Sequence, residues 1–475
     1  MPLILPGNVA SATASTGYTV DNSCRFNSAD SAYLSKTTGT ATNTDKCTIS
    51  FWVKRGMYSS DHKIITNYTD ASNRCYILFA GDEYLQVFQK LGGSTTIYLK
   101  TDRLFRDHSA WYNIIVAVDT SQVTESDRVK IYVNGVQETS FSSETYPSQN
   151  ENFRLNESSV PLEIGRAGLD VEYFNGYLSE FVLLDGQTLT PTSFGEFDED
   201  SPTIWKPIDV SGLTFGDNGF YLDFQNSAEL GTDVSGNSNT FTENNLDATD
   251  QATDTPTNNF CTLNPLNHPN PSEVPTMSQG NCQGVSTDSG HEAGFATIGV
   301  SAGKWYAEFK LSASTSAANS LVGVVKDPIS SVGTDDLDGS GLLYAVQANG
   351  SKYIAGSSTG AWADTFTTGD IIGVALDVDN SKIYFSKAGQ WTDGDGNYDE
   401  AAPNAYIDLS AGDTWFFCPA EAANSYNSTW QANFGGCSAF TVSSANQDAN
   451  GYGNFEYATP SGFYALCTKN LAEYG

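Results

Sequence analysis

The sequence predicts an all-β protein built from two antiparallel β-sandwiches. Its 475 residues exceed what a single hydrophobic core supports. The 43 Gly, 24 Tyr and 26 Phe, set against only 3 Met, favour strands and turns over helices. Short segments of alternating polar and apolar residues recur between clusters of Gly, Asn, Asp and Ser, and this spacing is typical of sandwiches.

A hairpin that occurs twice indicates two sandwiches. Residues 111–137, WYNIIVAVDTSQVTESDRVKIYVNGVQ, and residues 369–391, GDIIGVALDVDNSKIYFSKAGQW, each run an apolar strand into an aspartate and return through Lys-Ile-Tyr to a glycine turn. In both return strands apolar residues alternate with polar ones, so one face is expected to pack between two sheets. More than two hundred residues separate the copies, which is too far for a solenoid repeat. We therefore expect the same part in two separate sandwiches.

The composition along the chain predicts three segments. Strand-like stretches fill residues 1–200, which we expect to form the first sandwich, with one short helix at residues 189–200. Residues 201–258 are rich in Asp, Asn and Thr and are expected to be a connector with one or two strands. Strand-like stretches return in residues 259–475, the expected second sandwich.

The charge excludes several classes of partner. Lys plus Arg is 23 and Asp plus Glu is 56, so the formal net charge is −33. A surface this negative repels phosphate backbones and anionic lipid heads, so we expect neither nucleic-acid binding nor membrane insertion. The negative charge has two interpretations. It keeps the protein soluble, or it reflects cation binding or life in salty water, where ions screen the repulsion.

The first residues and the cysteines bear on the compartment. The opening MPLILPGNVASATAS lacks a basic region and a long apolar stretch, so we expect no Sec signal. Release from the producing cell would then need lysis or a dedicated machine. The eight cysteines are scattered, with no C-x-x-C and no His at zinc spacing, and we expect buried thiols rather than a disulfide framework.

Two domain families share motifs with the chain. The first segment resembles laminin-G-like domains of the concanavalin A type through CTISFWVKRG (47–56), FRDHSAWYNIIVAVD (105–119), DRVKIYVNGVQ (127–137) and FNGYLSEFVLLDGQTLT (174–190). The second resembles SPRY domains through GKWYAEFKL (303–311), VGVVKD (322–327), residues 369–391 and NFG (433–435). Both resemblances imply concanavalin A-like sandwiches of the jelly-roll type.

The order of the parts is similar to that of structural or appendage proteins of tailed phages of aquatic bacteria. The stretches that carry this likeness are RFNSADSAYLS (25–35), FGDNGFYLDF (215–224), DVSGNSNTF (233–241), TDTPTNNFCTLNPL (253–266) and GFYALCTKNL (462–471). The resemblance implies a virion protein assembled in the host cytoplasm and released by lysis, such as a tail fibre used in host attachment. Reduced cysteines agree with that route.

We expect no catalysis. A glycoside hydrolase on this fold needs two carboxylates facing one cleft. The nearest pattern, LDVDN, holds Asp377 and Asp379 at a turn. The four histidines are isolated in the sequence, and no Ser-His-Asp, HExxH or P-loop pattern occurs.

A calcium site is possible in one loop, although no cofactor is required. The stretch DGDGNYD places oxygen side chains at alternate positions, as the first half of an EF-hand loop does, at Asp393, Asp395, Asn397 and Asp399. The closing Glu is missing, because Asn404 stands there. Hairpin tips rich in Asp, Gly and Asn look the same without metal, so a metal-free turn is the alternative.

Aromatic residues near turns are candidates for stacking on sugar rings. They are Tyr344, Tyr353, Trp362 and Trp391, and packing within their own loops is the alternative. Trp52, Trp111 and Trp305 lie within strands and are expected in the core. SPRY domains usually bind protein or peptide through loops at one end of the sandwich, and the resemblance implies that residues 344–362 lie there.

The function we predict is non-enzymatic. The leading hypothesis is a phage adhesin that binds a host-surface glycan or protein. The alternatives are a capsid or tail decoration protein without a host ligand, and a secreted bacterial lectin. We also expect a homo-oligomer, with a trimer favoured by analogy to phage fibres, and contacts with other virion proteins.

Overall fold

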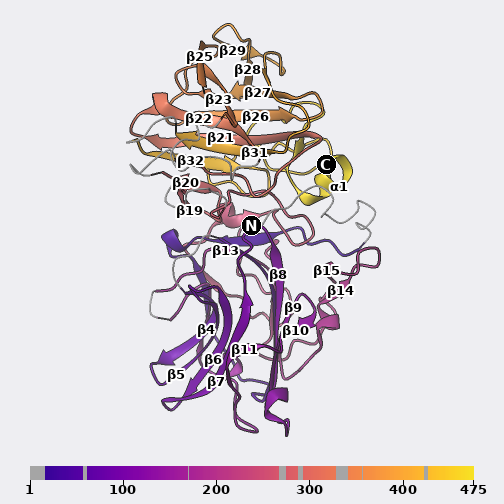
Figure 1. Cartoon of the computed structure of the whole chain (residues 1–475). Helices are drawn as coiled ribbons and strands as arrows, with labels where there is room; N and C mark the ends of the chain where they lie inside the picture. The colour runs from indigo at the N-terminus through magenta and orange to yellow at the C-terminus, as the bar shows by residue number, and fades with distance from the viewer. Residues whose placement is uncertain are drawn as a thin grey trace. The chain divides into compact units, whose positions relative to one another are not determined.

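The structure, a computed structural model, describes residues 17–56, 61–168, 171–266, 274–286, 292–327, 341–355, 357–421 and 426–475. These residues fall into two compact units, a first unit ending at Thr257 and a second unit beginning at Asn258 (Figure 1). Nearly all regular structure in them is β, in antiparallel sheets. The predicted fold class of two β-sandwiches is confirmed.

Two eight-stranded sheets form the first unit within the described residues. The first sheet has the order β10-β9-β8-β3-β13-β1-β18, with β16 also on β13, and the second has the order β11-β7-β6-β5-β4-β12-β2-β17. The first sheet holds β1 (Ser23–Phe26), β3 (Lys46–Arg55), β8 (Trp111–Asp119), β9 (Val129–Val133), β10 (Val136–Gln137), β13 (Gly176–Asp185), β16 (Phe220–Leu222) and β18 (Gln251–Ala252). The second sheet holds β2 (Tyr33–Thr37), β4 (His62–Asp70), β5 (Asn73–Phe79), β6 (Tyr84–Leu91), β7 (Ser94–Leu104), β11 (Phe141–Thr145), β12 (Pro161–Ile164) and β17 (Thr242–Asn244). A small hairpin joins β14 (Gly195–Phe197) to β15 (Trp205–Pro207).

The core of the first unit lies between its two sheets. One buried cluster takes Ile49 and Val116 from the first sheet and Ile77 and Val87 from the second. Along β6 the alternation is plain, because Val87 lies between the half-buried Gln86 and Phe88. Burying both inner faces in one cluster is what makes the unit a sandwich.

The expected connector belongs to the first unit. Strands β16, β17 and β18 pair with β13, β2 and β1, so residues 201–257 extend both sheets. Phe220, Leu222 and Phe241 from this segment are buried in the core. Because these side chains are buried in its core, residues 201–257 are part of the first sandwich and not a connector, and the boundary lies after Thr257.

The expected helix at residues 189–200 is also corrected. The chain makes one 3₁₀ turn, η5 (Pro191–Ser193), and continues into β14. A Cβ on Gly195 would lie 2.5 Å from the Trp205 ring. The segment therefore forms a closely packed hairpin, although its proline and the acids that follow favour a helix.

The second unit contains a ten-stranded sheet and a five-stranded sheet within its described residues. The larger sheet runs β19-β20-β32-β21-β26-β27-β28-β29, with β30 on β27 and β33 parallel to β21, and the smaller runs β25-β24-β23-β22-β31. The larger sheet holds β19 (Thr276–Ser278), β20 (Gln283–Val285), β21 (Lys304–Ser314), β26 (Ile371–Asp377), β27 (Lys382–Lys387), β28 (Gln390–Thr392), β29 (Tyr398–Glu400), β30 (Ile407–Asp408), β32 (Ser428–Asn433) and β33 (Tyr464–Ala465). The smaller sheet holds β22 (Ser320–Lys326), β23 (Leu343–Gln347), β24 (Ser351–Ile354), β25 (Ser357–Ala361) and β31 (Trp415–Glu421), and one helix, α1 (Thr468–Tyr474), ends the chain.

The repeated hairpin occupies matching places in the two units. Strands β8 and β9 pair in the first, and β26 and β27 pair in the second. The aspartate that ends the first strand pairs with the lysine that begins the neighbouring strand, Asp119 with Lys46 at 3.3 Å and Asp377 with Lys304 at 2.8 Å. The prediction of one architectural part used twice is confirmed.

Both return strands end in the same kind of turn. Asn134 and Gly135 have φ of 47° and 78°, and Ala388 and Gly389 have φ of 51° and 79°. Two successive residues with positive φ form the hairpin turn whose twist matches that of the strands. Glycine at the second position reduces the steric cost of this conformation.

Burial agrees with the expected roles of the cysteines and strand tryptophans. Seven of the eight cysteines are buried and Cys437 is half-buried. Trp52, Trp111 and Trp305 are buried, as expected for core residues. Among the residues that the structure describes, no helix combines the length and apolar character that crossing a bilayer requires.

Candidate functional site

Three of the four aromatic residues proposed near turns are packed inside the second unit. Tyr353, Trp362 and Trp391 are buried. The Trp362 ring meets Phe385 edge-on at 6.1 Å between centroids. A ring packed in this way has no face left for a sugar, so the structure favours packing over stacking at these positions.

Tyr344 is the least buried of the four. Its ring stands perpendicular to Trp415, with 5.2 Å between centroids. Trp391 packs against Tyr306, with 6.4 Å between ring centroids, and both lie in the larger sheet of this unit. The predicted aromatics therefore lie in separate packing contacts instead of one surface.

The loop proposed for calcium satisfies its own hydrogen bonds. The Asp393 carboxylate accepts bonds from the Asp395 amide at 2.7 Å, and from the Asn397 amide at 3.1 Å and side-chain amide at 2.8 Å. The Asn397 side chain, followed by these amides, holds the pKa of Asp393 below its usual value. Asp395 and Asp399 are exposed. In the described part of the chain, no group of three or more His, Cys, Asp or Glu is placed to hold a metal ion.

The aspartates of LDVDN have structural partners. Asp377 pairs with Lys304, and Asp379 accepts a hydrogen bond from the Gly303 amide at 2.7 Å. Asp377 also accepts hydrogen bonds from the Asn380 amide at 3.0 Å and side chain at 2.8 Å.

Two of the histidines are neighbours, although they are isolated in the sequence. His62 and His108 are buried beside the Arg55 guanidinium. Burial, reinforced by this positive charge, lowers the pKa of His62 to about 3 and that of His108 to about 4. Both imidazoles are neutral at physiological pH, which suits packing.

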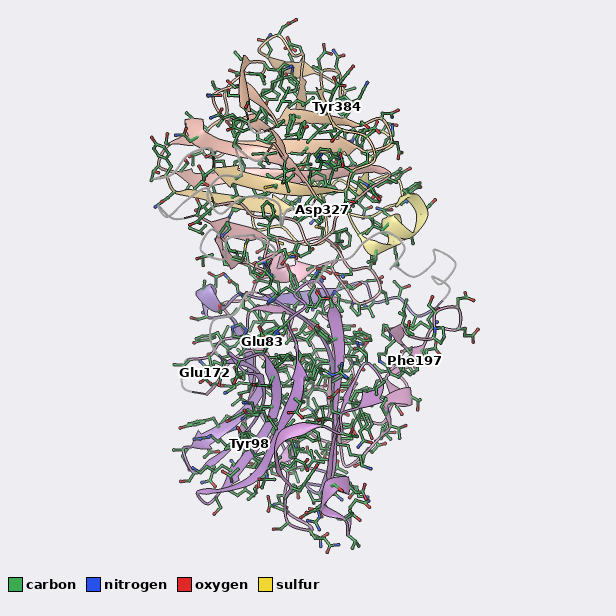
Figure 2. All side chains as sticks on the ribbon, in the orientation of Figure 1. Glu83, Tyr98, Glu172, Phe197, Asp327 and Tyr384 are labelled. Carbon is green, nitrogen blue, oxygen red and sulfur yellow. The ribbon has the colours of Figure 1, made fainter. Side chains whose placement is uncertain are left out.

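An aromatic row crosses the outward face of the second sheet in the first unit. Tyr76 on β5 lies opposite Phe88 on β6, and Phe88 lies opposite Tyr98 on β7. The Tyr76 and Phe88 rings stack at 4.8 Å, and Tyr98 stands nearly perpendicular to Phe88 at 6.0 Å. With Tyr84 on the same side of β6, these residues make the surface called here the aromatic face; Figure 2 labels Tyr98 on it. All four side chains are half-buried, which leaves part of each ring accessible to a ligand.

Cations flank the aromatic face. The Lys63 ammonium lies 4.1 Å from the Tyr76 ring centroid and 2.8 Å from a Glu172 carboxylate oxygen. Burial lowers the pKa of Lys63, and the Glu172 hydrogen bond opposes that shift. The Lys100 ammonium lies 3.3 Å from the Asp82 carboxylate. Lys63 and Lys100 are therefore each neutralised by a carboxylate of the first unit.

Sequence reasoning found the strands of this face but missed the face itself. The stretches RCYILFA, EYLQVFQK and TTIYLK alternate, so Tyr76, Phe88 and Tyr98 can each be placed on an outward position. Their alignment in one row depends on the register between strands, which the alternation alone does not set.

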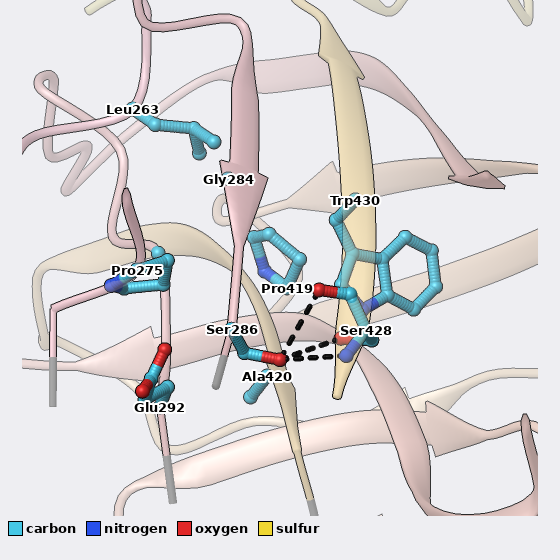
Figure 3. A pocket seen from close by; sticks show the side chains of 10 residues that line it. Leu263, Pro275, Gly284, Ser286, Glu292, Pro419, Ala420, Ser428 and Trp430 are labelled. Atoms are coloured by element: carbon cyan, nitrogen blue, oxygen red, sulfur yellow. Dashed lines mark hydrogen bonds between the residues drawn. The ribbon is translucent and has the colours of Figure 1, made fainter. Parts of the chain in front are cut away.

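A small hollow lies in the second unit, beside β20, β31 and β32. Figure 3 shows Leu263, Pro275, Pro419 and Trp430 around it, with hydrogen bonds joining the neighbouring Ser286 and Ser428. Its volume is about 230 Å³ when the open space at its mouth is counted, and its interior has room for about one water molecule. A sugar ring is too large for this hollow.

A buried carboxylate lies near the hollow. Glu421 is 2% exposed, and one of its oxygens has no hydrogen-bond partner among the described residues. The other oxygen lies 3.5 Å from the Ser320 hydroxyl. Burial, reinforced by the nearby Glu292 charge, raises the pKa of Glu421 to about 8.

A second buried carboxylate sits on a strained residue of β13. Glu180 has a φ of 49° in a β-bulge between Ser179 and Val182. Its carboxylate accepts hydrogen bonds from the Tyr221 hydroxyl at 2.7 Å and the Tyr18 hydroxyl at 3.2 Å. Burial raises the pKa of Glu180 to about 7. The two tyrosines lie on β16 and on the segment before β1, so this glutamate links β13 to both.

Two family models match the chain. Residues 27–193 match a laminin G-type model described as the concanavalin A-like lectin/glucanases superfamily, and residues 304–400 match the SPRY domain. The chain therefore contains a concanavalin A-like domain followed by a SPRY domain, as the sequence resemblances implied. No curated protein matches the chain.

Solved structures from several organisms are also similar to parts of the chain. The SPRY domain of human HERC1 is 21% identical, with a TM-score of 0.27, over 34% of this chain and 89% of that one. A SAP-like pentraxin from Limulus polyphemus is 16% identical, with a TM-score of 0.28, over 36% of this chain and 78% of that one. Domain 4 of the arabinanase AbnA from Geobacillus stearothermophilus, solved with arabinotriose, is 18% identical, with a TM-score of 0.24, over 32% of this chain and 65% of that one.

Proposed function

We propose that the chain is a non-enzymatic binding protein whose first unit holds a glycan on the aromatic face. The observation that carries this proposal is the row of Tyr76, Phe88 and Tyr98 on one outward sheet face. The superfamily described as lectins and glucanases, which residues 27–193 match, supports a carbohydrate ligand.

The chemistry of the aromatic face suits sugar rings. The apolar faces of sugars stack on aromatic rings, while polar groups bond their hydroxyls. Tyr98 and Tyr84 provide hydroxyl groups, and the Gln86 amide lies between the aromatic positions on β6. Because Phe88 and Tyr98 stand nearly perpendicular, they offer a ring edge and a ring face side by side.

Binding to polysaccharides tests the proposal. The full-length chain is passed over a panel of immobilised polysaccharides, and Tyr98→Ala and Tyr98→Phe are compared with it. We expect Tyr98→Ala to weaken retention by at least about tenfold, and Tyr98→Phe to keep most of it because the ring remains. Tyr406→Ala removes an exposed ring of the second unit and serves as the matched control.

Two outcomes would contradict the proposal. One is that no polysaccharide in the panel retains the full-length chain. The other is that Tyr98→Ala and Tyr406→Ala bind as the unmodified chain does. Circular dichroism of each variant separates a lost ligand contact from a lost fold.

We further propose that this binding serves a virion. The support is the order of sequence stretches similar to phage structural proteins, from RFNSADSAYLS to GFYALCTKNL. In this role the protein is an adhesin assembled in the host cytoplasm, and it works as a homo-oligomer, with a trimer favoured.

The test is to locate the protein in a purified phage particle with a labelled antibody. We expect label at the tail tips, whereas even label over the shell would favour a decoration protein. A monomer at micromolar concentration, measured by light scattering, would overturn the oligomer.

A further inference from the structure

One end of the aromatic face carries positive charge that the protein does not neutralise. Arg74 on β5 lies directly opposite Lys90 on β6. Among the described residues, neither forms an ion pair with a carboxylate. Acids outnumber bases 56 to 23 in this chain, so two adjacent unpaired cations are a departure from its general composition.

This arrangement costs stability. Like charges directly opposite on neighbouring strands destabilise a sheet. The other cations of the face avoid that cost, since Lys63 pairs with Glu172 and Lys100 pairs with Asp82. A charge pair kept without partners, beside an aromatic row, is suited to a negatively charged ligand.

The two cations adjoin the rings. The Arg74 guanidinium carbon lies 5.6 Å from the Phe88 ring centroid. Lys90 follows Phe88 by two positions on β6, on the same face and about 7 Å along the strand. One Arg74 nitrogen donates a hydrogen bond to the Ala71 carbonyl at 3.0 Å, which leaves the other guanidinium donors for a ligand.

We propose that the aromatic face takes a carboxylated polysaccharide, with a sugar ring against Phe88 and Tyr98 and its carboxylate between Arg74 and Lys90. This inference rests on the proposed glycan binding and names the ligand class. The planar guanidinium fork matches a carboxylate in a two-bond geometry, and the ammonium adds a point charge. The uncharged part of the ring is held by the aromatic side chains.

Charge-removed variants of the full-length chain test this assignment. Arg74→Gln with Lys90→Gln keeps length and polarity but removes both charges. Lys130→Gln with Lys469→Gln makes the same change in net charge on half-buried lysines elsewhere, and is the matched control. Affinity is measured for polygalacturonate, neutral dextran and poly-L-glutamate at low and at physiological salt.

We expect the full-length chain to bind polygalacturonate, and Arg74→Gln/Lys90→Gln to bind it at least about tenfold more weakly, because charged hydrogen bonds are lost. The control variant should bind as the unmodified chain does. The melting temperature of Arg74→Gln/Lys90→Gln should equal or exceed that of the unmodified chain, since the like-charge contact is gone. Weaker binding with an unchanged or raised melting temperature separates ligand contact from folding.

Other outcomes overturn the inference in distinguishable ways. If polygalacturonate and dextran bound equally and Tyr98→Ala lost both, glycan binding would be supported, but recognition of a carboxylate would be refuted. Equal binding of poly-L-glutamate and polygalacturonate would assign the site to acidic peptides. Retention of no polysaccharide would end the proposed function together with this inference.

Discussion

Lys54 and Asp254 form a fully buried ion pair, with 2.6 Å between the ammonium and a carboxylate oxygen. The two residues are 200 positions apart in the sequence. The other Asp254 oxygen accepts a hydrogen bond from the Trp111 indole at 3.0 Å. This pair anchors the end of the segment that the composition marks as a connector to β3 and β8 of the first sandwich.

Removing one partner of this pair should strongly destabilise the first unit. We expect Asp254→Ala to lower its free energy of unfolding by about 3–5 kcal/mol, because Lys54 is left as a buried unpaired charge. Urea unfolding of the full-length chain, followed by tryptophan fluorescence, measures the effect. Lys54→Met combined with Asp254→Ala should recover part of the loss, since no buried charge remains. A double variant less stable than Asp254→Ala would contradict this account.

Glu421 should make the stability of the second unit depend on pH. Its pKa is about 8 in the folded chain, against 4.5 as the ordinary value, so between these values the folded state holds a proton that the unfolded state has lost. Stability due to this group is therefore full below pH 4.5 and declines as pH rises towards 8. The groups facing it are the Ser320 and Ser428 hydroxyls and the Glu292 carboxylate.

Glu421→Gln isolates this contribution. The variant should match the unmodified chain at pH 5 and exceed it at pH 8 by roughly 2–4 kcal/mol, because the amide needs no proton. Denaturant unfolding at both pH values is the measurement. Glu199→Gln, which changes an exposed glutamate, is the control for net charge. Equal pH profiles for Glu421→Gln and the unmodified chain would remove Glu421 as the cause.

Glu308 should hold the C-terminal segment to the larger sheet of the second unit. Its buried carboxylate accepts hydrogen bonds from the amides of Glu456 and Tyr457 at 2.9 and 2.8 Å, and from the Asn433 side chain at 3.2 Å. We expect Glu308→Ala to cost about 2–4 kcal/mol, since each buried donor left without a partner costs about 1–3 kcal/mol. Limited proteolysis should then cut first near residues 456–457. Cleavage elsewhere, with this segment still protected, would refute the role.

The melting temperature of the protein should rise with salt, but calcium should not raise it further by binding the loop at residues 393–399. Sodium at the ionic strength of seawater screens the net charge of −33 and should raise the melting temperature. Millimolar calcium added to that salt should produce no further rise, because the Asp393 carboxylate already accepts bonds from its own loop. Asp395→Asn with Asp399→Asn keeps this turn and removes two exposed carboxylates. A calcium increment that disappears in this variant would establish a metal site.

The sequence by itself determined the fold class and the use of one hairpin in two sandwiches. These follow from local rules, namely alternation with a period of two, turn residues at fixed positions, and aspartate at the end of an apolar strand. The burial of Trp52, Trp111 and Trp305 was also predictable, because each lies on an apolar strand. The family resemblances depended on the same stretches, and the order of a concanavalin A-like domain followed by a SPRY domain is confirmed.

Tertiary structure alone decided where the acids act and which aromatics share a surface. Asp185 and Asp254 look like ordinary charges of a −33 chain, yet both are buried, and Asp185 accepts bonds from the amides of Thr42, Asn43 and Asn218. A carboxylate's partner at long range is set by packing, which no local pattern encodes. Likewise, Phe88 and Tyr98 become neighbours only when β6 and β7 pair in one register, because a slip of one residue would turn either ring to the opposite face.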